Sequence, residues 1–242
     1  MFSSDNWQEI FQTIKKNKLR TFLSGFTVAL GLLIFITLLG LGNGLNNSFN
    51  QFFMDDATNT FFVFPGRTSM PHKGFKVNRV IRFKNDDIKD IQQNFPFYLE
   101  YITPRVFRNG NVVYKSESNS YSYVGVGPAH QHSEKTIIMK GRYINDLDVA
   151  NKTKYAVIGR LVEADLFKNE NAIGKHVIIN NTAYKVIGVF QDDGGDNEER
   201  RIYVPYTTLQ LVEKNTDYVD QIVLAFKPAL GYAGAMVFEE KL

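Results

Sequence analysis

The longest apolar stretch of the chain lies near the N-terminus and predicts a helix that spans a membrane. Residues Thr21–Leu41 read TFLSGFTVALGLLIFITLLGL and include no charged side chain. At 1.5 Å per residue this helix would be roughly 30 Å long, which matches the hydrocarbon core of a bilayer. The alternative, a buried helix of a soluble domain, rarely reaches this length without a polar face. We therefore expect residues 21–41 to form a transmembrane helix.

Charges on the two sides of this segment indicate its direction. Basic residues precede it, at Lys15, Lys16, Lys18 and Arg20, whereas residues 42–66 contain no basic side chain. Basic flanks stay in the cytoplasm, so we expect a cytoplasmic N-terminus and an extracytoplasmic remainder. A cleaved signal peptide is the competing interpretation, but only Gly40 and Gly42 resemble a cleavage site.

An apolar stripe precedes the predicted span. Trp7, Ile10, Phe11 and Ile14 follow the i, i+3, i+4, i+7 spacing of one helix face. A tryptophan on that face and lysines at its end are typical of a helix lying in the membrane interface. We expect residues 1–20 to form a cytoplasmic amphipathic elbow, with these four residues and the four basic ones at the interface.

Small side chains in the span predict contact with another helix. Gly25 and Ala29, and likewise Thr27 and Gly31, are four residues apart, which lets a neighbouring helix approach closely. Small residues are also common in membrane helices that lack a partner, so this signal is a weak one.

The rest of the chain predicts an α+β domain built of strand–helix–strand units with a β-rich insert. After a helical stalk at residues 42–57, one unit spans 58–107 and the matching unit spans 200–228. In the first unit, Ile88, Ile91 and Phe95 mark the buried face of a helix that begins near Asn85. Residues 229–242 are expected to begin a return stalk.

The insert, residues 108–199, contains two predicted hairpins and one helix. The first hairpin turns around the sequence SESNS, and the second turns at Asn180–Asn181. The helix is expected at Arg160–Phe167, with Leu161, Ala164 and Phe167 facing inward.

The segment Arg67–Lys84 holds six basic side chains and no acidic one. A patch for nucleic acid or lipid headgroups is one interpretation. Because Phe75, Val77, Ile81 and Phe83 are separated by polar or basic residues, the pattern favours a half-buried strand with a solvated face.

Composition narrows the possible chemistry. The 242 residues are 44% hydrophobic and 22% charged, which is typical of a folded protein, and the formal net charge is only +3. The chain has no cysteine, so disulfides and thiolate chemistry are excluded. The patterns GxxxxGK[ST], HExxH and GxSxG are absent. We expect no enzyme activity, no cofactor, no metal and no nucleic-acid partner.

Two side-chain groups keep metal-site hypotheses open. His130 and His132 could share a metal on one side of an extended segment. The acidic segment Asp192–Glu199 could hold calcium, but it lacks EF-hand spacing, and a solvated glycine-rich loop is the favoured interpretation.

Several motifs together resemble one family. The segment Asn17–Leu45 (NKLRTFLSGFTVALGLLIFITLLGLGNGL) resembles the start of MacB/FtsX-type ABC transporter permeases. Asn59–Gly66 is similar to the family's first outer strand, and Lys140–Asp148 to its Gly-Arg-aromatic turn. Tyr155–Phe190 carries the most specific likeness, and Arg200–Gln210 resembles the strand that closes the insert.

The resemblance implies a MacB-like periplasmic core at residues 58–242 and a permease without catalysis of its own, in a bacterial inner membrane. A separate cytoplasmic ABC ATPase would supply the movement, and a second permease copy or homologue is expected. A periplasmic adaptor or an outer-membrane partner is also implied. Family permeases have three further membrane helices after the outer domain. We therefore expect residues 1–242 to be either a truncated permease or one piece of such a permease, and we do not expect this chain to transport alone. The alternative function is a single-span module for extracytoplasmic binding or sensing.

Overall fold

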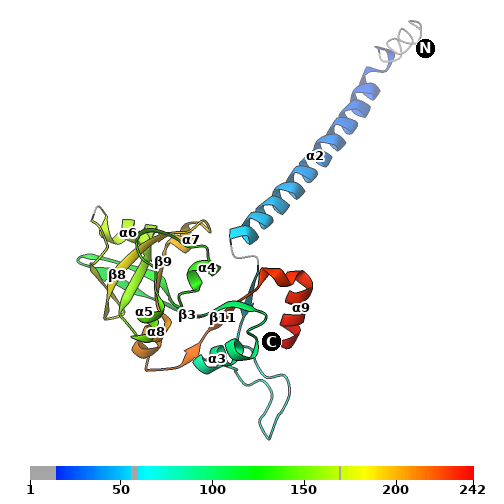
Figure 1. The fold of residues 1–242 in the computed structure, drawn as a ribbon. Coiled ribbons are helices and arrows are strands. Elements are labelled where there is room, and N and C mark those ends of the chain that lie inside the picture. The colour runs from blue at the N-terminus through cyan, green and yellow to red at the C-terminus, as the bar shows by residue number, and fades with distance from the viewer. Residues whose placement is uncertain (1–14, 56–58, 169) are drawn as a thin grey trace. The chain divides into compact units, whose positions relative to one another are not determined.

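The computed structural model describes residues 15–55, 59–168 and 170–242, and the chain divides into two compact units, Met1–Phe52 and Phe53–Leu242. The first unit is dominated by helix α2, Lys18–Asp55 (Figure 1). Its part Lys18–Gly42 is long and apolar enough to cross a membrane and contains the expected segment 21–41. The hydroxyl of Thr37 donates to the Leu33 carbonyl at 2.7 Å, so this polar group is satisfied within the helix.

The second unit is built on one mixed sheet. Within the described residues nine strands join it, in the order β1–β11–β3–β4–β9–β6–β8–β5, and β7 pairs with both β3 and β8. The strands are β1 Thr60–Val63, β3 Leu99–Tyr114, β4 Glu117–Val126, β5 Ile137–Gly141, β6 Tyr155–Gly159, β7 His176–Ile179, β8 Thr182–Gln191, β9 Arg201–Pro205 and β11 Gln221–Phe226. A separate two-stranded sheet pairs β2, Phe83–Lys84, with β10, Tyr218–Val219.

Strand β3 belongs to two halves of this sheet. Its first half pairs with β11, which in turn pairs with β1. Its second half pairs with β4 and β7, and the pairs β4–β9, β9–β6, β6–β8 and β8–β7 close a ring of strands. The β-rich insert is therefore a small barrel, and β9 lies among its strands.

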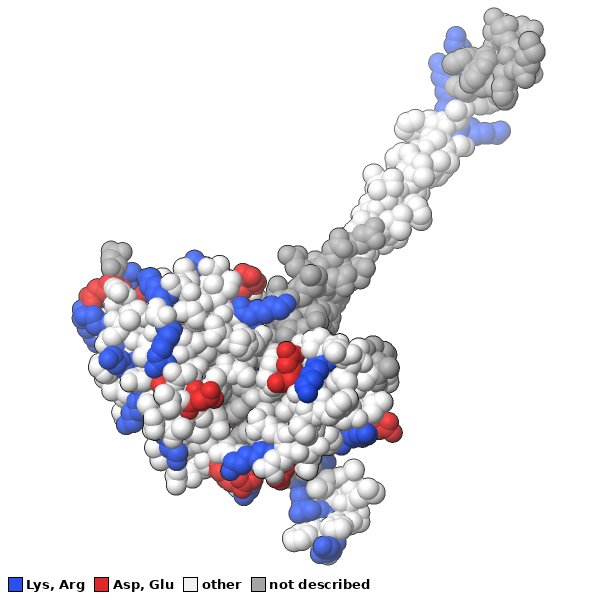
Figure 2. Space-filling view, in the orientation of Figure 1, with Lys and Arg blue, Asp and Glu red and all other residues white. Residues whose placement is uncertain are grey.

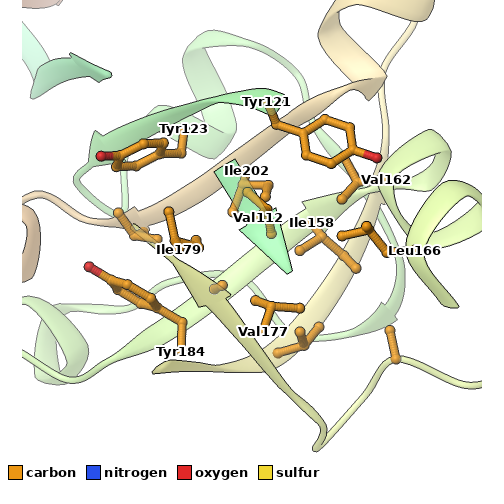
Figure 3. Close-up of a cluster of buried hydrophobic side chains, with 14 of the residues drawn as sticks. Val112, Tyr121, Tyr123, Ile158, Val162, Leu166, Val177, Ile179, Tyr184 and Ile202 are labelled. Carbon is orange, nitrogen blue, oxygen red and sulfur yellow. The ribbon is translucent and has the colours of Figure 1, made fainter. Parts of the chain in front are cut away.

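The barrel encloses the largest apolar cluster. Figure 3 shows aliphatic side chains such as Val112, Ile158 and Ile202 between the tyrosines of β4 and β8. Helix α6, Arg160–Phe167, covers one side of this cluster. Its buried residues are Val162, Leu166 and Phe167. The prediction of Phe167 as an inward residue is confirmed, Leu161 is only partly buried, and the prediction for Ala164 is wrong because Ala164 is exposed.

The other half of the sheet is covered by α3, Asn85–Asn94, and by α9, Gly231–Lys241. Ile88 and Ile91 of α3 pack against Ile102 and Leu224, as their spacing predicts. Phe238 of α9 is fully buried and stacks on Tyr98 with ring centroids 5.3 Å apart. The remaining short helices are α4 His130–Ser133, α5 Asp146–Ala150, α7 Asp196–Glu199, α8 Tyr206–Val212 and the 3-10 turn η1 Pro228–Leu230.

The fold class, an apolar N-terminal helix followed by an α+β domain, is confirmed. One local prediction is wrong: residues 75–82 do not form a half-buried strand, and only Phe83 and Lys84 enter a sheet. The segment Gly66–Arg82, called the finger below, is held by isolated bridges between Arg67 and Val80 and between His72 and Phe75. The alternation of apolar and polar residues was misleading, because no strand in the described part of the chain pairs with residues 75–82 to cover their apolar side.

The hairpin predictions are confirmed with one adjustment. Asn180 and Asn181 have φ of 42° and 68°, and Ile179 pairs with Thr182 across them, as in a two-residue turn. The first hairpin turns earlier than expected, because Tyr114 already pairs with Glu117.

Candidate functional site: the strand junction of the outer domain

Arg105 lies at the point where β3 passes from the β1–β11 half of the sheet to the barrel half. This point is called the strand junction below. Its backbone pairs with Gln221 of β11 on one side and with Val126 of β4 on the other. The side chain is 9% exposed. A buried guanidinium needs anionic or polar partners, so its contacts identify what this position joins.

The contacts of Arg105 come from three different elements. One guanidinium nitrogen forms an ion pair with Glu134, which directly follows α4. Another lies 3.4 Å from the amide oxygen of Gln221 on β11. The guanidinium carbon is 5.5 Å from the ring centre of Phe62 on β1. One side chain therefore links the β1–β11 half with the barrel half.

Arg108 makes a second link, three residues further along β3. It pairs with the carboxylate of Glu213, just after α8, and with that of Asp220 at 2.7 Å. Asp220 also accepts a hydrogen bond from the Phe107 backbone at 2.9 Å. The connection between α8 and β11 is thus tied to β3, next to Arg105.

Packing explains the Gly-Arg-aromatic turn at Lys140–Asp148. Gly141 has φ of +74°, and a Cβ there would lie 2.1 Å from the Ile187 carbonyl oxygen. Arg142 forms a two-bond ion pair with buried Asp148, at 2.5 and 3.0 Å. Tyr143 lies with its hydroxyl 2.7 Å from Nδ1 of buried His130. These residues hold the turn, so the motif has a structural role in this chain.

His130 is a buried neutral partner rather than an exposed ligand. Burial holds its pKa well below the usual range, with the cations Arg105 and Arg201 adding to the effect. The predicted extended segment is wrong, because both histidines lie in the short helix α4, and the ring of His132 lies 6.3 Å from that of Tyr101. In the described part of the chain no three His, Asp or Glu side chains are placed to hold a metal ion. Neither metal hypothesis gains support from this arrangement.

Acidic groups near the junction are poorly solvated. Burial raises the pKa of Asp192 and that of Glu198 above their ordinary values, and the Glu134 carboxylate contributes in the same direction to both. Glu198 also pairs with Arg201. The buried hydroxyl of Tyr203 has no hydrogen-bond partner among the described residues. This region combines close packing with uncompensated polar groups, which is unusual for a purely structural core.

The residues predicted to lie at the membrane are placed as follows. Trp7, Ile10, Phe11 and Ile14 lie outside the described residues. Lys15, Lys16, Lys18 and Arg20 are exposed beside the start of α2. The small residues Gly25, Thr27, Ala29 and Gly31 are exposed, and a Cβ on either glycine would meet nothing within 4 Å. Two residues turn a helix by about 200°, so the Gly25–Ala29 and Thr27–Gly31 pairs lie on nearly opposite faces.

Sequence reasoning did not find Arg105 or Arg108. Both stand in a strand of mixed apolar and basic residues, where exposed arginines are expected. The position of Arg105 within the sequence Thr-Pro-Arg-Val-Phe is the one local signal of a buried cation. Its partners lie 29 and 116 residues away in sequence, so local patterns do not reveal them.

Comparison with known proteins identifies the family. Residues 21–233 match the MacB-like periplasmic core domain, and the chain belongs to this family. Among curated proteins it is 28% identical to the macrolide export ATP-binding/permease protein MacB of Chlorobium luteolum over 231 residues, and 25% identical to that of Bdellovibrio bacteriovorus over 222. These matches cover 94% and 90% of this chain but 35% and 34% of the relatives. The chain thus spans about one third of the length of these relatives.

Solved structures show the same fold. The periplasmic region of MacB from Actinobacillus actinomycetemcomitans superposes with a TM-score of 0.64 at 22% identity, covering 78% of this chain and 85% of that one. The extracellular domain of the ABC-type transporter YknZ from Gram-positive bacteria gives 0.57 at 15% identity, covering 75% and 94%. The family resemblance read from the sequence is confirmed.

Proposed function

We propose that residues 1–242 are the first membrane helix and the outer domain of an ABC transporter permease that transmits movement across a membrane. In this proposal α2 crosses a bacterial inner membrane with its N-terminus in the cytoplasm and the outer domain in the periplasm. A separate cytoplasmic ATPase hydrolyses ATP and moves the helix. The export of a substrate, the release of a lipoprotein or the activation of a partner would use the resulting displacement.

One observation carries this proposal: α2 continues without interruption from Lys18 to Asp55, well beyond the part that can span a membrane, and β1 begins at Thr60. Backbone hydrogen bonds join each turn of a continuous helix to the next, so in this proposal a displacement at one end is transmitted to the other. From β1 the route continues through hydrogen-bonded β11 to β3, and β3 extends into the barrel. At the strand junction, ion pairs of Arg105 and Arg108 connect β3 to the neighbouring elements.

The residues themselves favour a role in transmission over catalysis. The polar groups brought together at the junction are ion pairs and amides that connect elements, rather than a nucleophile beside a base. The proposed second permease copy would pack against the small faces of α2. A periplasmic adaptor or outer-membrane partner would bind the outer domain.

The proposal is tested with the product of the whole reading frame, expressed together with each ABC ATPase subunit encoded in the same genome. The complex is placed in lipid nanodiscs with a spin label at exposed position 154 of the barrel in each copy. We expect the ATPase to co-purify and ATP with vanadate to change the distance between labels. Absence of an associated ATPase, or an ATP-independent distance, would favour the alternative of a single-span binding or sensing module.

A further inference from the structure

The finger, residues Gly66–Arg82, is ordered by its own hydrogen bonds although little of it is buried. Backbone bonds join Thr68 to Arg79 at 3.0 Å and Ile81 to Gly66 at 2.9 Å. The Arg79 guanidinium lies 4.5 Å from the ring centre of Phe75. Figure 1 shows this segment, coloured cyan to teal, projecting beyond α3. A projecting hairpin with its own bonding can present side chains to another molecule.

The side chains it presents are apolar and basic. Met70 is 74% and Phe75 56% exposed, and Val77, Val80 and Ile81 are also exposed. So many neighbouring exposed apolar side chains are uncommon on a surface that stays in water. The cations of the finger are Arg67, Lys73, Lys76, Arg79 and Arg82, and it has no acidic residue. The lobe at the bottom of Figure 2 accordingly shows blue and white atoms without red.

None of these five cations forms an ion pair with another described residue. Lys84, which follows the finger directly in sequence, pairs with Asp217. Two carboxylates do lie close to its base, Glu213 and Asp220, but both are held by Arg108. The finger therefore has an unmatched positive charge available to an external partner.

A groove of about 720 Å³ lies at the base of the finger. Val80, Ile81 and Arg82 line it together with Val212, Lys214 and Tyr218. Arg108 and its two carboxylate partners, Glu213 and Asp220, line it as well. The Arg82 guanidinium lies 4.8 Å from the ring centre of Tyr218. The groove therefore places this cation beside the apolar side chains of Val80 and Ile81. A concave site of this kind accepts a protruding segment, whereas the headgroup plane of a membrane cannot enter it.

We propose that the finger and this groove form a docking site for an acidic segment of another protein. Carboxylates of that segment would pair with Arg82, Lys214 and the cations of the finger, and its apolar side chains would cover Val80 and Ile81. The inference rests on the proposed function only in naming a site for a partner of the outer domain, and it requires neither an ATPase nor movement of α2. Failure of one therefore leaves the other standing.

The test uses the full chain in phosphatidylcholine nanodiscs and dye-labelled synthetic peptides. One peptide alternates glutamate with leucine, and its control alternates glutamate with serine. Fluorescence anisotropy should show about tenfold tighter binding of the leucine peptide, with affinity falling as salt rises. Reversal of two cations, Lys76→Glu with Arg82→Glu, should weaken binding by at least about tenfold. The matched reversal on the barrel, Lys154→Glu with Lys185→Glu, should change it by less than about twofold.

Each other outcome overturns the proposal. No binding of the leucine peptide, or equal binding by wild type and the finger variant, removes the site. Equal affinity for both peptides shows that charge alone is responsible, without the apolar groove. Binding to phosphatidylglycerol vesicles without binding to the leucine peptide assigns the finger to a lipid surface. Far-UV circular dichroism confirms that the variants are folded, and the salt dependence of wild type gives a reading that needs no variant.

Discussion

The side-chain amides of Asn85 and Gln210 exchange two hydrogen bonds, of 3.0 and 2.9 Å, between the first turn of α3 and helix α8. Gln210 also donates to the Tyr218 carbonyl at 3.0 Å and is 4% exposed. The residues are 125 positions apart. This reciprocal pair joins the helix that covers the β1–β11 half to the helix that leaves barrel strand β9.

Replacement of Gln210 should therefore loosen the contact between α3 and α8. Gln210→Leu leaves the Asn85 amide and the Tyr218 carbonyl without their partner, so we expect a loss of about 1–3 kcal/mol in the free energy of unfolding. Urea unfolding followed by far-UV circular dichroism measures this loss. The matched control is exposed Gln93 of α3, where Gln93→Leu should change stability by no more than about 0.5 kcal/mol. Equal losses in the two variants would show that the amide pair is not structural.

Replacing Arg105 alone should lower the free energy of unfolding more than replacing Arg105 and Glu134 together. Arg105→Met leaves Glu134 unpaired with a side chain only 10% exposed, for which we expect a loss of about 3–5 kcal/mol. Adding Glu134→Gln to this variant removes the buried charge and should recover part of that loss. A double-mutant cycle from urea unfolding gives the coupling. Simple additivity of the two single changes would contradict the contact.

Substitutions at two glycines with positive φ should distinguish the cost of backbone strain from the cost of steric clash. Gly141 and Gly174 have φ of +74° and +83°, but only at Gly141 would a Cβ meet a nearby atom. Gly174→Ala should cost about 1–2 kcal/mol, from the left-handed backbone alone. Gly141→Ala should cost more, because the Ile187 carbonyl must move, and its thermal midpoint should fall further. Similar midpoints in the two variants would mean that the turn relaxes freely.

The acidic groups should give opposite dependences of stability on pH. Burial alone would raise the pKa of Asp148, but hydrogen bonds from Arg142 and the Asn145 backbone outweigh it and lower that pKa. Its stabilisation is therefore full above the unfolded pKa of about 4 and is lost as pH falls through the lower folded value. Asp148→Asn should destabilise the protein at neutral pH and approach wild type in acid.

Asp192 should behave in the opposite way, because its pKa is raised by burial. A raised folded pKa means that the native state binds the proton more tightly. Its contribution is full below an unfolded pKa of about 4 and is lost as pH rises through the folded value. As pH rises from about 4 through the folded pKa of Asp192, the free energy of unfolding should therefore fall less in Asp192→Asn than in the wild type. Unfolding curves at a series of pH values check both signs, and parallel curves for the two variants would refute them.

The opposite faces of α2 predict two separable contacts in the membrane. Gly25→Ile would fill the face shared with Ala29, and Gly31→Ile the face shared with Thr27. Each should weaken helix association in lipid by about 1 kcal/mol if a neighbour packs on that face. Energy transfer between labelled chains in lipid vesicles measures self-association, with Leu33→Ile as a control. Unchanged transfer in both glycine variants would remove the prediction of close packing with a second copy.

Local signals in the sequence determined the elements that depend on neighbours along the chain. The uncharged run Thr21–Leu41 predicts its helix because length and hydrophobicity alone decide whether a segment can cross a bilayer. Asn180–Asn181 predicts its turn because asparagine tolerates positive φ. The limits of α6 and the apolar face of α3 likewise follow from local periodicity, and the ordered motifs were sufficient to indicate the family.

Tertiary structure alone decided the rest, because it depends on which strands pair. The alternation of residues 75–83 has the pattern of a strand, but burial requires a neighbouring strand. Among the described residues, such a strand pairs only with Phe83 and Lys84. Arg105 is buried because β3 happens to pass between β11 and β4 there, with Glu134 brought beside it. The sequence therefore determined an apolar N-terminal helix, long enough to cross a membrane, followed by an α+β domain. Long-range pairing decided where that domain is braced and which surface it leaves exposed.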